Sequence, residues 1–386
     1  MNELTQTIKS LIHKSGHITF AKFMELALYH PNYGYYASGK AKIGKEGDYY
    51  TSSSVHPAFG EVLGRFICRA WELVAVSDFT VIEMGAGKGF LSLDILDSIK
   101  RNNPTLYDRL SYLIIELSPQ LREEGKATLR EHLSKIKWVD FLTDLKLESI
   151  SGVFISNELV DSLPFHRAKL KNRKLQEIFV GLRDEDFVEF IGEPSSLELK
   201  EYFKGYDLEF EDEQEVEINL KAREWLSDIS SVLSKGLVLT VDYGFLTPEL
   251  YSSIRMKGTF RCFHKHTLNE NPYLNIGEQD ITAHVNFSDL IRTGDSLGLS
   301  TIKYITQGQF LVDWGILDII ERYSSSDISS EKSRLAIKNL FLPELMGERF
   351  KVLIQSKNLE NKIRTFYPES PFRISFQSPL DRYKGL

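Results

Sequence analysis

The chain has 386 residues, of which 42% are hydrophobic and 26% are charged, and its formal net charge is -7. This composition predicts a soluble globular protein with a large core, built as two or three structural units or as one large domain with an insertion. The acidic balance argues against a dedicated nucleic-acid binder, which normally carries a basic field. No apolar run reaches the roughly 20 residues that a membrane span needs.

The cysteine content bears on the cellular compartment. The two cysteines, Cys68 and Cys262, predict no disulfide framework, which fits a reducing environment. The N-terminal stretch MNELTQTIKSLIHKSG lacks the apolar core of a signal peptide and the Arg-rich character of a transit peptide. We therefore expect a cytoplasmic protein.

The first segment, residues 4–30, is predicted to be helical. One apolar stripe begins at Leu4 and a second begins at Phe20, both with the spacing of an amphipathic helix, and His30 precedes the proline that ends the pattern. Residues 33–54 are rich in Gly, Tyr and Ser without periodicity, which predicts an ordered loop or lid. Aromatic packing of the N-terminal helices on the core, through these tyrosines, is an equal alternative.

From Thr80 onward, short apolar strands alternate with amphipathic helices. The predicted strands are 79–84, 112–116, 136–141 and 152–158. One helix follows the first strand, and a second begins at Ser118-Pro119 and carries an apolar stripe as far as Ile136. This alternation predicts a parallel, doubly wound sheet, which is a Rossmann-like α/β core.

The pattern changes after the fourth strand. Residues 165–193 alternate like hairpin strands, 194–218 are acid-rich, and 219–233 are helical before a buried strand resumes at 236–244. We expect an inserted α+β subdomain, whose hairpins are compatible with a homodimer, and a solvated acidic surface rather than a docking face. The expected domains are 1–75 for the N-terminal helices and lid, 76–164 and 236–386 for the core with its C-terminal elaboration, and 165–235 for the insertion.

The stretch VIEMGAGKGF, residues 81–90, joins the end of a strand to three glycines. A dinucleotide-binding fingerprint needs Gly-x-Gly-x-x-Gly, but here the third glycine, Gly89, comes one residue early. Gly-x-Gly-x-Gly with an acidic residue two positions before the first glycine is the pattern of methyltransferases that use S-adenosylmethionine. A tight turn without a ligand is the alternative. It is disfavoured because the strand, glycines, helix, second strand and terminal acid follow in register.

Two carboxylates beside this turn are predicted to bind the cofactor. Glu83 could accept a hydrogen bond from the methionine ammonium group, directly or through water. Glu116 ends the second strand, where carboxylates bind ribose hydroxyls in doubly wound sheets. A hydrogen bond to a charged group contributes roughly 1.5–3 kcal/mol, so Glu116 should matter for affinity. The other candidate cofactor contacts are Gly85, Ala86, Gly87, Gly89, Leu117, Ser118, Asp140, Gly47 and Asp48.

Four further stretches resemble the MidA family of S-adenosylmethionine-dependent methyltransferases. They are GDYYTSSSVHPAFGE (47–61), SNELVDSLPFHR (156–167), GTFRCFHKH with GEQDITAHVNF (258–266 and 277–287), and MGERFKVL (346–353). The resemblance runs from about residue 5 to residue 356 and implies methyl transfer. Mitochondrial members of this family are complex I assembly factors that symmetrically dimethylate an arginine of a core subunit, so the resemblance also implies an arginine-bearing protein substrate.

One position departs from the family pattern. Many members have Thr-Ser-Pro-Glu-Ile-Ser where this chain has the segment from Thr51 to His56, so Ser54 stands in place of a glutamate. Any role of that glutamate is lost here or belongs to another residue. The departure bears on the choice of substrate more than on methyl transfer itself.

Methyl transfer to an arginine needs carboxylates beyond the fourth strand. The guanidinium group is always protonated and its lone pairs are delocalised. Carboxylates can hold its positive charge on one side and orient it through paired hydrogen bonds, while the site aligns the nucleophile and excludes water. We predict Glu158 first and Asp161 second as this clamp, with Asn157 contacting the cofactor or orienting the loop. Glu158 as a cap of the following turn is the alternative.

Four residues are predicted to line the substrate channel, namely Tyr243, Gln279, Asp280 and His284. A buried tyrosine with a satisfied hydroxyl is an equal alternative for the first of them. The histidines at 264–266 could join His284 in a metal site in principle. We expect no metal, because no cysteine contributes, the spacing matches no compact zinc motif, and the methyl donor needs no metal.

The sequence therefore predicts an S-adenosylmethionine-dependent methyltransferase, with no nucleic-acid partner and with a protein arginine as the favoured target. Methylation of a small molecule or of another protein side chain is the first alternative. The second is a non-catalytic assembly chaperone that retains the cofactor fold. The intact glycine turn, Glu116 and Glu158 argue against a pure scaffold, which has no need for them.

Overall fold

The structure is a computed structural model, and it describes residues 2–37, 55–172, 174–265, 267–323, 328–359 and 363–368. The chain divides into two compact units. The first unit consists of Met1–Tyr49, Val160–Trp225 and Gly244–Leu290. The second consists of Tyr50–Leu159, Leu226–Tyr243 and Ile291–Leu386.

This division differs from the expected domains in several places, and it joins the N-terminal residues as far as Tyr49 to the inserted hairpins in one unit. Residues 244–290 belong with the inserted hairpins in the first unit, rather than with the α/β core. The helix α4 (Ala58–Val74) belongs to the second unit, rather than to an N-terminal domain. Residues 244–290 begin within the strand β10, so no change in the sequence pattern marks the boundary between the units there.

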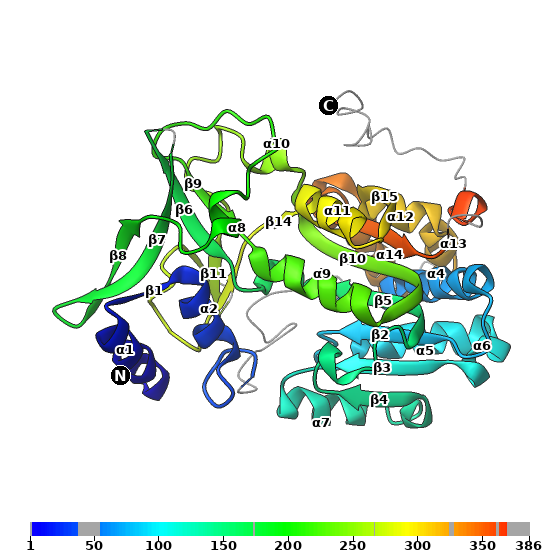
Figure 1. Ribbon diagram of the computed structural model, residues 1–386. Helices are drawn as coiled ribbons and strands as arrows, with labels where there is room; N and C mark the ends of the chain where they lie inside the picture. Colours follow the sequence, from blue (N-terminus) through cyan, green and yellow to red (C-terminus); the bar gives the residue numbers. More distant parts are fainter. Residues whose placement is uncertain are drawn as a thin grey trace. The chain divides into compact units, whose positions relative to one another are not determined.

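The second unit contains the predicted Rossmann-like sheet, with the strand order β15-β16-β10-β5-β2-β3-β4 (Figure 1). The strands are β2 (Thr80–Met84), β3 (Ser111–Ile115), β4 (Ile136–Val139), β5 (Ile150–Asn157), β10 (Leu233–Phe245), β15 (Ser300–Thr306) and β16 (Phe350–Lys357). The run from β10 to β4 is parallel, as the alternating pattern predicted. β16 is antiparallel to both of its neighbours, a direction that its apolar pattern does not reveal.

The strand order places the ligand-binding edge of this sheet. The chain enters at β2, adds β3 and β4 on one side, and then crosses to add β5 and β10 on the other side. The order therefore reverses between β2 and β5. In open α/β sheets, ligands bind outside the carboxyl ends of the strands at such a reversal. The turns that follow β2 and β5 are thus the first places to look for a site.

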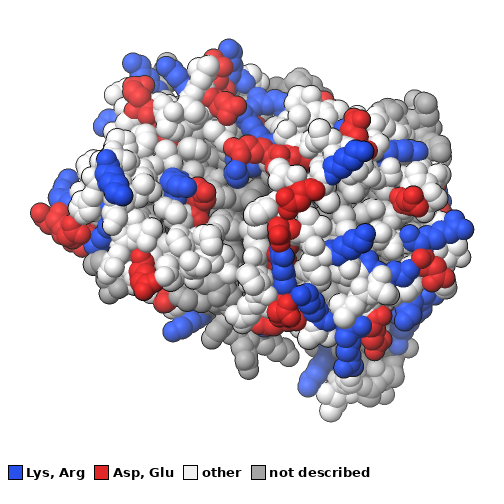
Figure 2. Space-filling model, turned by 60° about the horizontal axis from the view of Figure 1, so that its bottom comes forward, with Lys and Arg blue, Asp and Glu red and all other residues white. Residues whose placement is uncertain are grey.

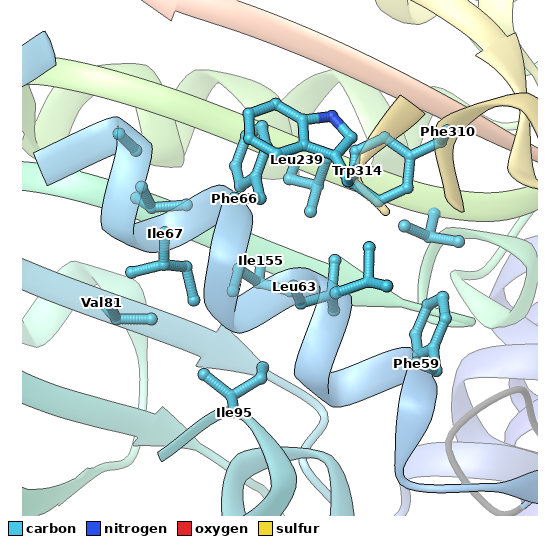
Figure 3. Packing of buried hydrophobic residues seen from close by; sticks show 14 of the residues in the cluster. Phe59, Leu63, Phe66, Ile67, Val81, Ile95, Ile155, Leu239, Phe310 and Trp314 are labelled. Carbon is cyan, nitrogen blue, oxygen red and sulfur yellow. The ribbon is translucent and has the colours of Figure 1, made fainter. Parts of the chain in front are cut away.

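Helices cover this sheet and build its core. They are α4, α5 (Phe90–Asn102), α6 (Pro104–Arg109), α7 (Pro119–Thr128), α12 (Gln307–Asp313), α13 (Ile316–Glu321) and α14 (Ile328–Phe341), while α9 (Leu220–Val232) and α11 (Phe287–Ser296) contain residues of both units. Figure 3 shows Phe59, Leu63 and Phe66 of α4 packed among side chains of the sheet and of α12. A Cβ on Gly60 would lie 2.4 Å from the Cβ of Asp94, so a glycine there lets α4 and α5 approach closely.

The helix α7 begins as predicted and ends earlier than predicted. The side chain of Ser118 accepts a hydrogen bond from the Leu121 N–H at 3.3 Å, and Pro119 is the first helical residue. The helix ends at Thr128, whereas the apolar stripe suggested an end near Ile136. Leu133 is 45% exposed in a short turn, and Ile136 already begins β4. Apolar residues of a turn and a strand had extended the apparent helical pattern.

The first unit contains a five-stranded antiparallel sheet and a small three-stranded sheet. The strands of these two sheets are β1 (His17–Thr19), β6 (His166–Lys171), β7 (Lys174–Arg183), β8 (Asp186–Gly192), β9 (Glu215–Ile218), β11 (Arg261–His264), β12 (Thr267–Asn269) and β13 (Asp280–Thr282). A further short strand, β14 (Val285–Asn286), pairs in parallel with Gly244 and Phe245 at the end of β10. Its other helices are α1 (Glu3–Ser15), α2 (Phe20–Tyr29), α8 (Leu197–Lys200) and α10 (Thr247–Leu250). The predicted hairpin strands of residues 165–193 are confirmed.

The N-terminal segment is not helical throughout. Between α1 and α2, the short strand β1 pairs with β7, with His17 opposite Gly181. A three-residue strand whose partner lies far along the chain leaves no local periodicity to detect. Beyond α2, Tyr35 is buried and the Tyr36 hydroxyl donates to Asp280 Oδ1 at 2.7 Å.

The rest of the expected lid, residues 38–54, lies outside the described residues, and with it the candidate contacts Gly47 and Asp48. Among the described helices, none combines the length and the hydropathy that a membrane span needs. On the face shown in Figure 2, acidic and basic side chains are interspersed, and neither sign covers a broad area.

Candidate active site

The glycine turn after β2 has a shape that requires glycine. Gly85, Gly87 and Gly89 have φ values of 73°, 55° and 78°, in the left-handed region that side chains with a Cβ disfavour. A Cβ on Gly85 would lie 3.1 Å from Leu159 Cδ1, and one on Gly89 would lie 2.9 Å from Leu129 Cδ1. Gly85 is exposed, whereas Gly87 and Gly89 are buried, so both the backbone conformation and the close packing of the turn require glycine.

Glu83 lies at the end of β2, directly before this turn. It is 3% exposed, and its Oε2 accepts hydrogen bonds from Ser92 Oγ at 2.5 Å and from the Tyr112 hydroxyl at 2.6 Å. Burial raises the pKa of Glu83, and these two hydrogen bonds oppose the shift. The carboxyl group thus ties the turn to α5 and β3. Its contact with a methionine ammonium group stays a prediction.

Glu116 directly follows β3 and bridges two turns. It is 7% exposed, and it accepts the Gly87 N–H at Oε2 and the Ser118 N–H at Oε1, both at 2.9 Å. Burial raises the pKa of Glu116, while the backbone donors and Arg122 act in the opposite direction. Each carboxylate oxygen can accept a second hydrogen bond. The ribose role that the sequence predicts for Glu116 is therefore compatible with both existing contacts.

The neighbouring turns supply an ion pair and apolar surface. Arg122 donates to the Glu116 carbonyl at 2.5 Å and pairs with Asp140 Oδ1, also at 2.5 Å, so it joins the ends of β3 and β4. Leu117 and Phe141 are 41% and 57% exposed beside these polar groups. The sequence analysis passed over Arg122 and Phe141, although each is close in sequence to a residue that it singled out.

These residues fit S-adenosylmethionine as a ligand. The cofactor offers a flat base with apolar faces, a ribose diol and a methionine part. The exposed Leu117 and Phe141 suit the base, Glu116 suits the diol, and the glycine turn admits close approach of the rest. Ser118 uses its hydroxyl to cap α7, and Ala86 packs partly against the core, so any contact of these two with the cofactor would involve other atoms.

The turn after β5 carries the predicted catalytic residues Asn157 and Glu158. Glu158 has a φ of 54°, an uncommon value for a residue with a side chain. Its backbone N–H donates to the Val241 carbonyl at 2.9 Å, and Asn157 Nδ2 donates to its Oε1 at 3.2 Å. Strained backbone of this kind is concentrated at functional sites, where surrounding contacts hold it in place.

Two polar atoms beside Glu158 are buried without a hydrogen-bond partner among the described residues. They are Ser156 Oγ and Asn157 Oδ1, at the carboxyl end of β5. Such groups are rare because each unsatisfied polar atom carries a desolvation penalty. A ligand that offers hydrogen-bonding groups at this edge of the sheet would satisfy them.

The predicted channel residue Tyr243 belongs to the second unit, whereas Asp161 and the other channel residues belong to the first. Tyr243 is half-buried, and its ring centroid lies 5.8 Å from that of Phe350. Asp161 is buried, and its carbonyl accepts the Ala283 N–H at 3.0 Å.

Gln279 is used within its own loop. It is 1% exposed, donates to the carbonyls of Asn271 and Pro272 at 3.0 and 3.1 Å, and accepts from Asn269 Nδ2 at 3.2 Å. These three hydrogen bonds of Gln279 stabilise the loop between β12 and β13. Its predicted place in a substrate channel has no support in this geometry and stays a prediction.

Asp280 begins the short strand β13, and His284 lies two residues beyond its end. Asp280 is 2% exposed and accepts from Tyr36, while the His284 backbone N–H donates to Thr259 Oγ1 at 3.1 Å. The His284 ring lies 5.3 Å from the Phe245 ring. Within the part of the chain that the structure describes, no group of three His, Cys, Asp or Glu side chains could hold a metal ion, and His266 is not described.

Comparison with known proteins identifies the family. A family model described as "Putative S-adenosyl-L-methionine-dependent methyltransferase" matches residues 62–305. The mitochondrial protein arginine methyltransferase NDUFAF7 of Mus musculus is 26% identical over 379 residues, which cover 90% of this chain and 84% of that protein. The Homo sapiens protein of the same name is 27% identical, with 90% and 83% covered.

Solved structures agree with these sequence matches. A Burkholderia thailandensis protein, crystallised with bound S-adenosyl-homocysteine, superimposes with a TM-score of 0.83 at 27% identity, covering 95% of both chains. The predicted fold, the MidA-like resemblance and the cofactor are thereby confirmed. The chain belongs to the family of S-adenosyl-L-methionine-dependent methyltransferases.

Proposed function

We propose that this enzyme methylates an arginine nitrogen of a protein substrate. The observation that carries the proposal is the turn after β5, where Glu158 keeps a left-handed backbone and presents a carboxylate beside Asn157. The names of the relatives support the same target, since the Mus musculus and Homo sapiens proteins are protein arginine methyltransferases.

The position of Glu158 relative to the glycine turn suits this chemistry. Its neighbour Leu159 lies against Gly85, so the carboxylate turn and the cofactor turn are in contact within one unit. A nucleophile held at Glu158 would therefore lie close to a ligand that is held by the glycine turn. Such proximity turns a bimolecular encounter into an oriented, effectively unimolecular step.

S-adenosylmethionine supplies, when bound, a methyl group on a positively charged sulfur. As the nitrogen–methyl bond forms, the carbon–sulfur bond would break with its electron pair on sulfur, and the nitrogen would lose one proton. The protein must therefore bind a guanidinium group, orient one of its nitrogens and offer a carboxylate that accepts this proton. Glu158 can accept paired N–H donors from the guanidinium and hold its positive charge away from the attacking nitrogen. Asp161, three residues later in the chain, is the proposed second acceptor, and Asn157 orients Glu158 through its amide.

Location and assembly stay proposals. The cysteines Cys68 and Cys262 are free thiols, which fits the expected cytoplasmic location, whereas the named relatives are mitochondrial. A homodimer compatible with the hairpins, and the expected absence of a nucleic-acid partner, rest on the sequence alone.

A labelling experiment tests the proposal. Purified protein is incubated with S-adenosylmethionine carrying a radioactive methyl group and with an extract of cells that lack this chain. Protein and small-molecule fractions are then separated, and the protein is hydrolysed to identify the labelled amino acid. We expect label in methylarginine, and at least about a hundredfold less of it with Glu158→Gln. Label confined to small molecules, or to another amino acid, would overturn the proposed target.

A further inference from the structure

We propose that Asp242 is a positioning residue that holds Glu158 in its strained, active conformation. This inference rests on the proposed role of Glu158 and adds to it the group that sets its backbone. Asp242 lies near the end of β10, the strand that pairs with β5. It is fully buried, and no substrate or cofactor contact is needed to explain its presence there.

The contacts of Asp242 begin where the pairing of β5 and β10 ends. The ladder pairs Asn157 with Val241, and the next backbone group, the Glu158 N–H, still donates to the Val241 carbonyl at 2.9 Å. The following N–H, that of Leu159, leaves the ladder and donates to Asp242 Oδ2 at 3.3 Å. The side chain of Asp242 thus accepts a backbone N–H from the turn, just beyond the last pair of the ladder.

The second oxygen of the same carboxylate fixes its own strand. Asp242 Oδ1 accepts the Tyr243 N–H at 2.9 Å. One buried carboxylate therefore binds a backbone N–H from the turn after β5 and another from β10, at the edge where the site lies. Bonds to a charged acceptor in a buried place are stronger than neutral ones, because the low dielectric strengthens them.

The turn needs this support because its conformation is unfavourable for glutamate. A left-handed backbone brings the Cβ of a residue close to the following carbonyl oxygen. Hydrogen bonds on both sides, at the N–H of Glu158 and at the N–H of Leu159, oppose relaxation to an extended backbone. Relaxation would rotate the Cα–Cβ bond of Glu158 and break the contact of its Oε1 with Asn157.

Asp242 also affects the cofactor side of the site through Leu159. The same residue whose N–H binds Asp242 has its side chain against Gly85, at the start of the glycine turn. The carboxylate therefore sets both the direction of Glu158 and the spacing between its turn and the cofactor turn. A purely structural role would instead confine the effect of Asp242 to the stability of the fold.

A double-mutant cycle separates these two roles. In Asp242→Asn the side chain keeps its shape but replaces one acceptor oxygen with an amide N–H2, which opposes one of the two backbone donors. We expect this variant to lower kcat for methyl transfer into the extract proteins by about tenfold to a hundredfold, the size of effect that misplacing a reacting group produces. In a Glu158→Gln background, the same change should lower kcat by less than about threefold, because residues that act through each other are not additive.

Each outcome of the cycle bears on one proposal. Equal fold-losses from Asp242→Asn in both backgrounds, or full activity of Asp242→Asn alone, would overturn the positioning role. Full activity of Glu158→Gln would instead overturn the proposed function of Glu158. The matched control is Asp313→Asn, which alters a carboxylate of the same unit that accepts from Gln309 and Tyr367, and it should leave kcat unchanged.

A second measurement is needed in case Asp242→Asn does not fold. Hydrogen exchange of the Leu159 amide in the unsubstituted protein reports directly on its bond to Asp242. We expect exchange as slow as that of the amides within β5, since the bond continues the ladder. Exchange as fast as in an exposed loop would show that Asp242 does not hold the turn.

Discussion

Two turns at the carboxyl edge of one sheet meet the same backbone demand in different ways. After β2, left-handed backbone occurs at Gly85, Gly87 and Gly89, and after β5 it occurs at Glu158. Glycine adopts this conformation freely, whereas a residue with a Cβ is disfavoured by roughly 1–2 kcal/mol. The turn after β2 requires its three glycines for backbone conformation and close packing. The second keeps a side chain at this cost, as the exposed turn at Glu148 also does, so it is the place of Glu158 at the carboxyl edge of the sheet that singles it out.

The two turns are nevertheless supported by the same device. Glu116 accepts backbone N–H groups from the glycine turn and from the turn after β3. Asp242 accepts backbone N–H groups from the turn after β5 and from its own strand β10. In each case a buried carboxylate connects the ends of neighbouring parallel strands. The four predictions that follow test whether backbone conformation matters at the turn after β2 and side-chain chemistry at the turn after β5.

The largest effect, on the rate of methyl transfer, is expected from a substitution of Glu158 in the turn after β5. Glu158→Gln preserves size but removes the charge that would hold a guanidinium, so methyl transfer should fall by about a hundredfold to ten-thousandfold, the range of a positioned acid–base group. Affinity for S-adenosylmethionine should change little. Radiolabel incorporation and calorimetry measure the two quantities, and a parallel loss of both would place Glu158 on the cofactor side instead.

The next effect concerns the shape of the glycine turn. Gly87→Val adds a β-branched side chain at a φ of 55°, so the turn must change, and binding of S-adenosylmethionine should weaken by about a hundredfold or more. Calorimetric titration measures it. Gly298→Val is the matched control, because Gly298 has a φ of 78° in the same unit with nothing within 4 Å of its added Cβ. Equal losses in both variants would mean that the effect is general destabilisation.

A smaller effect on affinity is expected from Glu116→Gln. The amide leaves one of the two backbone donors without an acceptor and weakens the ribose contact, so affinity should fall by about tenfold, at the lower end of the range for charged hydrogen bonds. Burial raises the pKa of Glu116. In the unsubstituted protein, affinity should therefore fall as pH decreases through that raised pKa, which lies above the range of an exposed glutamate. Titrations from neutral to acidic pH should show this dependence, and Glu116→Gln should lack it.

The smallest effect is a gain in stability at the strained residue. Glu158→Gly relieves roughly 1–2 kcal/mol of left-handed strain but adds the roughly 0.5–1 kcal/mol entropy of glycine, so the free energy of unfolding should rise by about 0.5 kcal/mol. Denaturant unfolding measures it, and methyl transfer should be lost. Glu148→Gly is the control. Glu148 is exposed and has a φ of 49°, so this substitution should raise the free energy of unfolding by a similar amount without loss of methyl transfer. A destabilised Glu158→Gly would contradict the assignment of strain.

The fold was predictable where the signal was local. The glycine turn, the strands around it and the Ser118 cap of α7 each follow from a few neighbouring residues, and the structure contains all of them. The strand β1 was missed because three residues show no period and their partner is β7. The end of α7 was misplaced because apolar residues in the next turn and strand continued its stripe by coincidence.

The site was predictable in its residue types but not in its contacts. The sequence singled out Glu116, Asn157 and Glu158 from their places after strands, and those residues do lie at the carboxyl edge. It did not reveal that Glu116 binds the Gly87 N–H, or that Arg122 joins the ends of β3 and β4. It placed Gln279 in a channel, whereas the structure shows its amide bonded within its own loop.

The sequence by itself determined the chemistry that this chain can carry. Three glycines after an apolar strand and acids at strand ends are patterns of adjacent residues, so they can be recognised without knowing the fold. Only the tertiary structure decided which backbone group each buried carboxylate accepts. Asp242 and the Leu159 N–H are 83 residues apart in the chain, and they meet because β5 and β10 pair in a register that ends at that position. That register is a property of the assembled sheet, since hydrogen bonds between strands depend on packing that no single stretch of sequence contains.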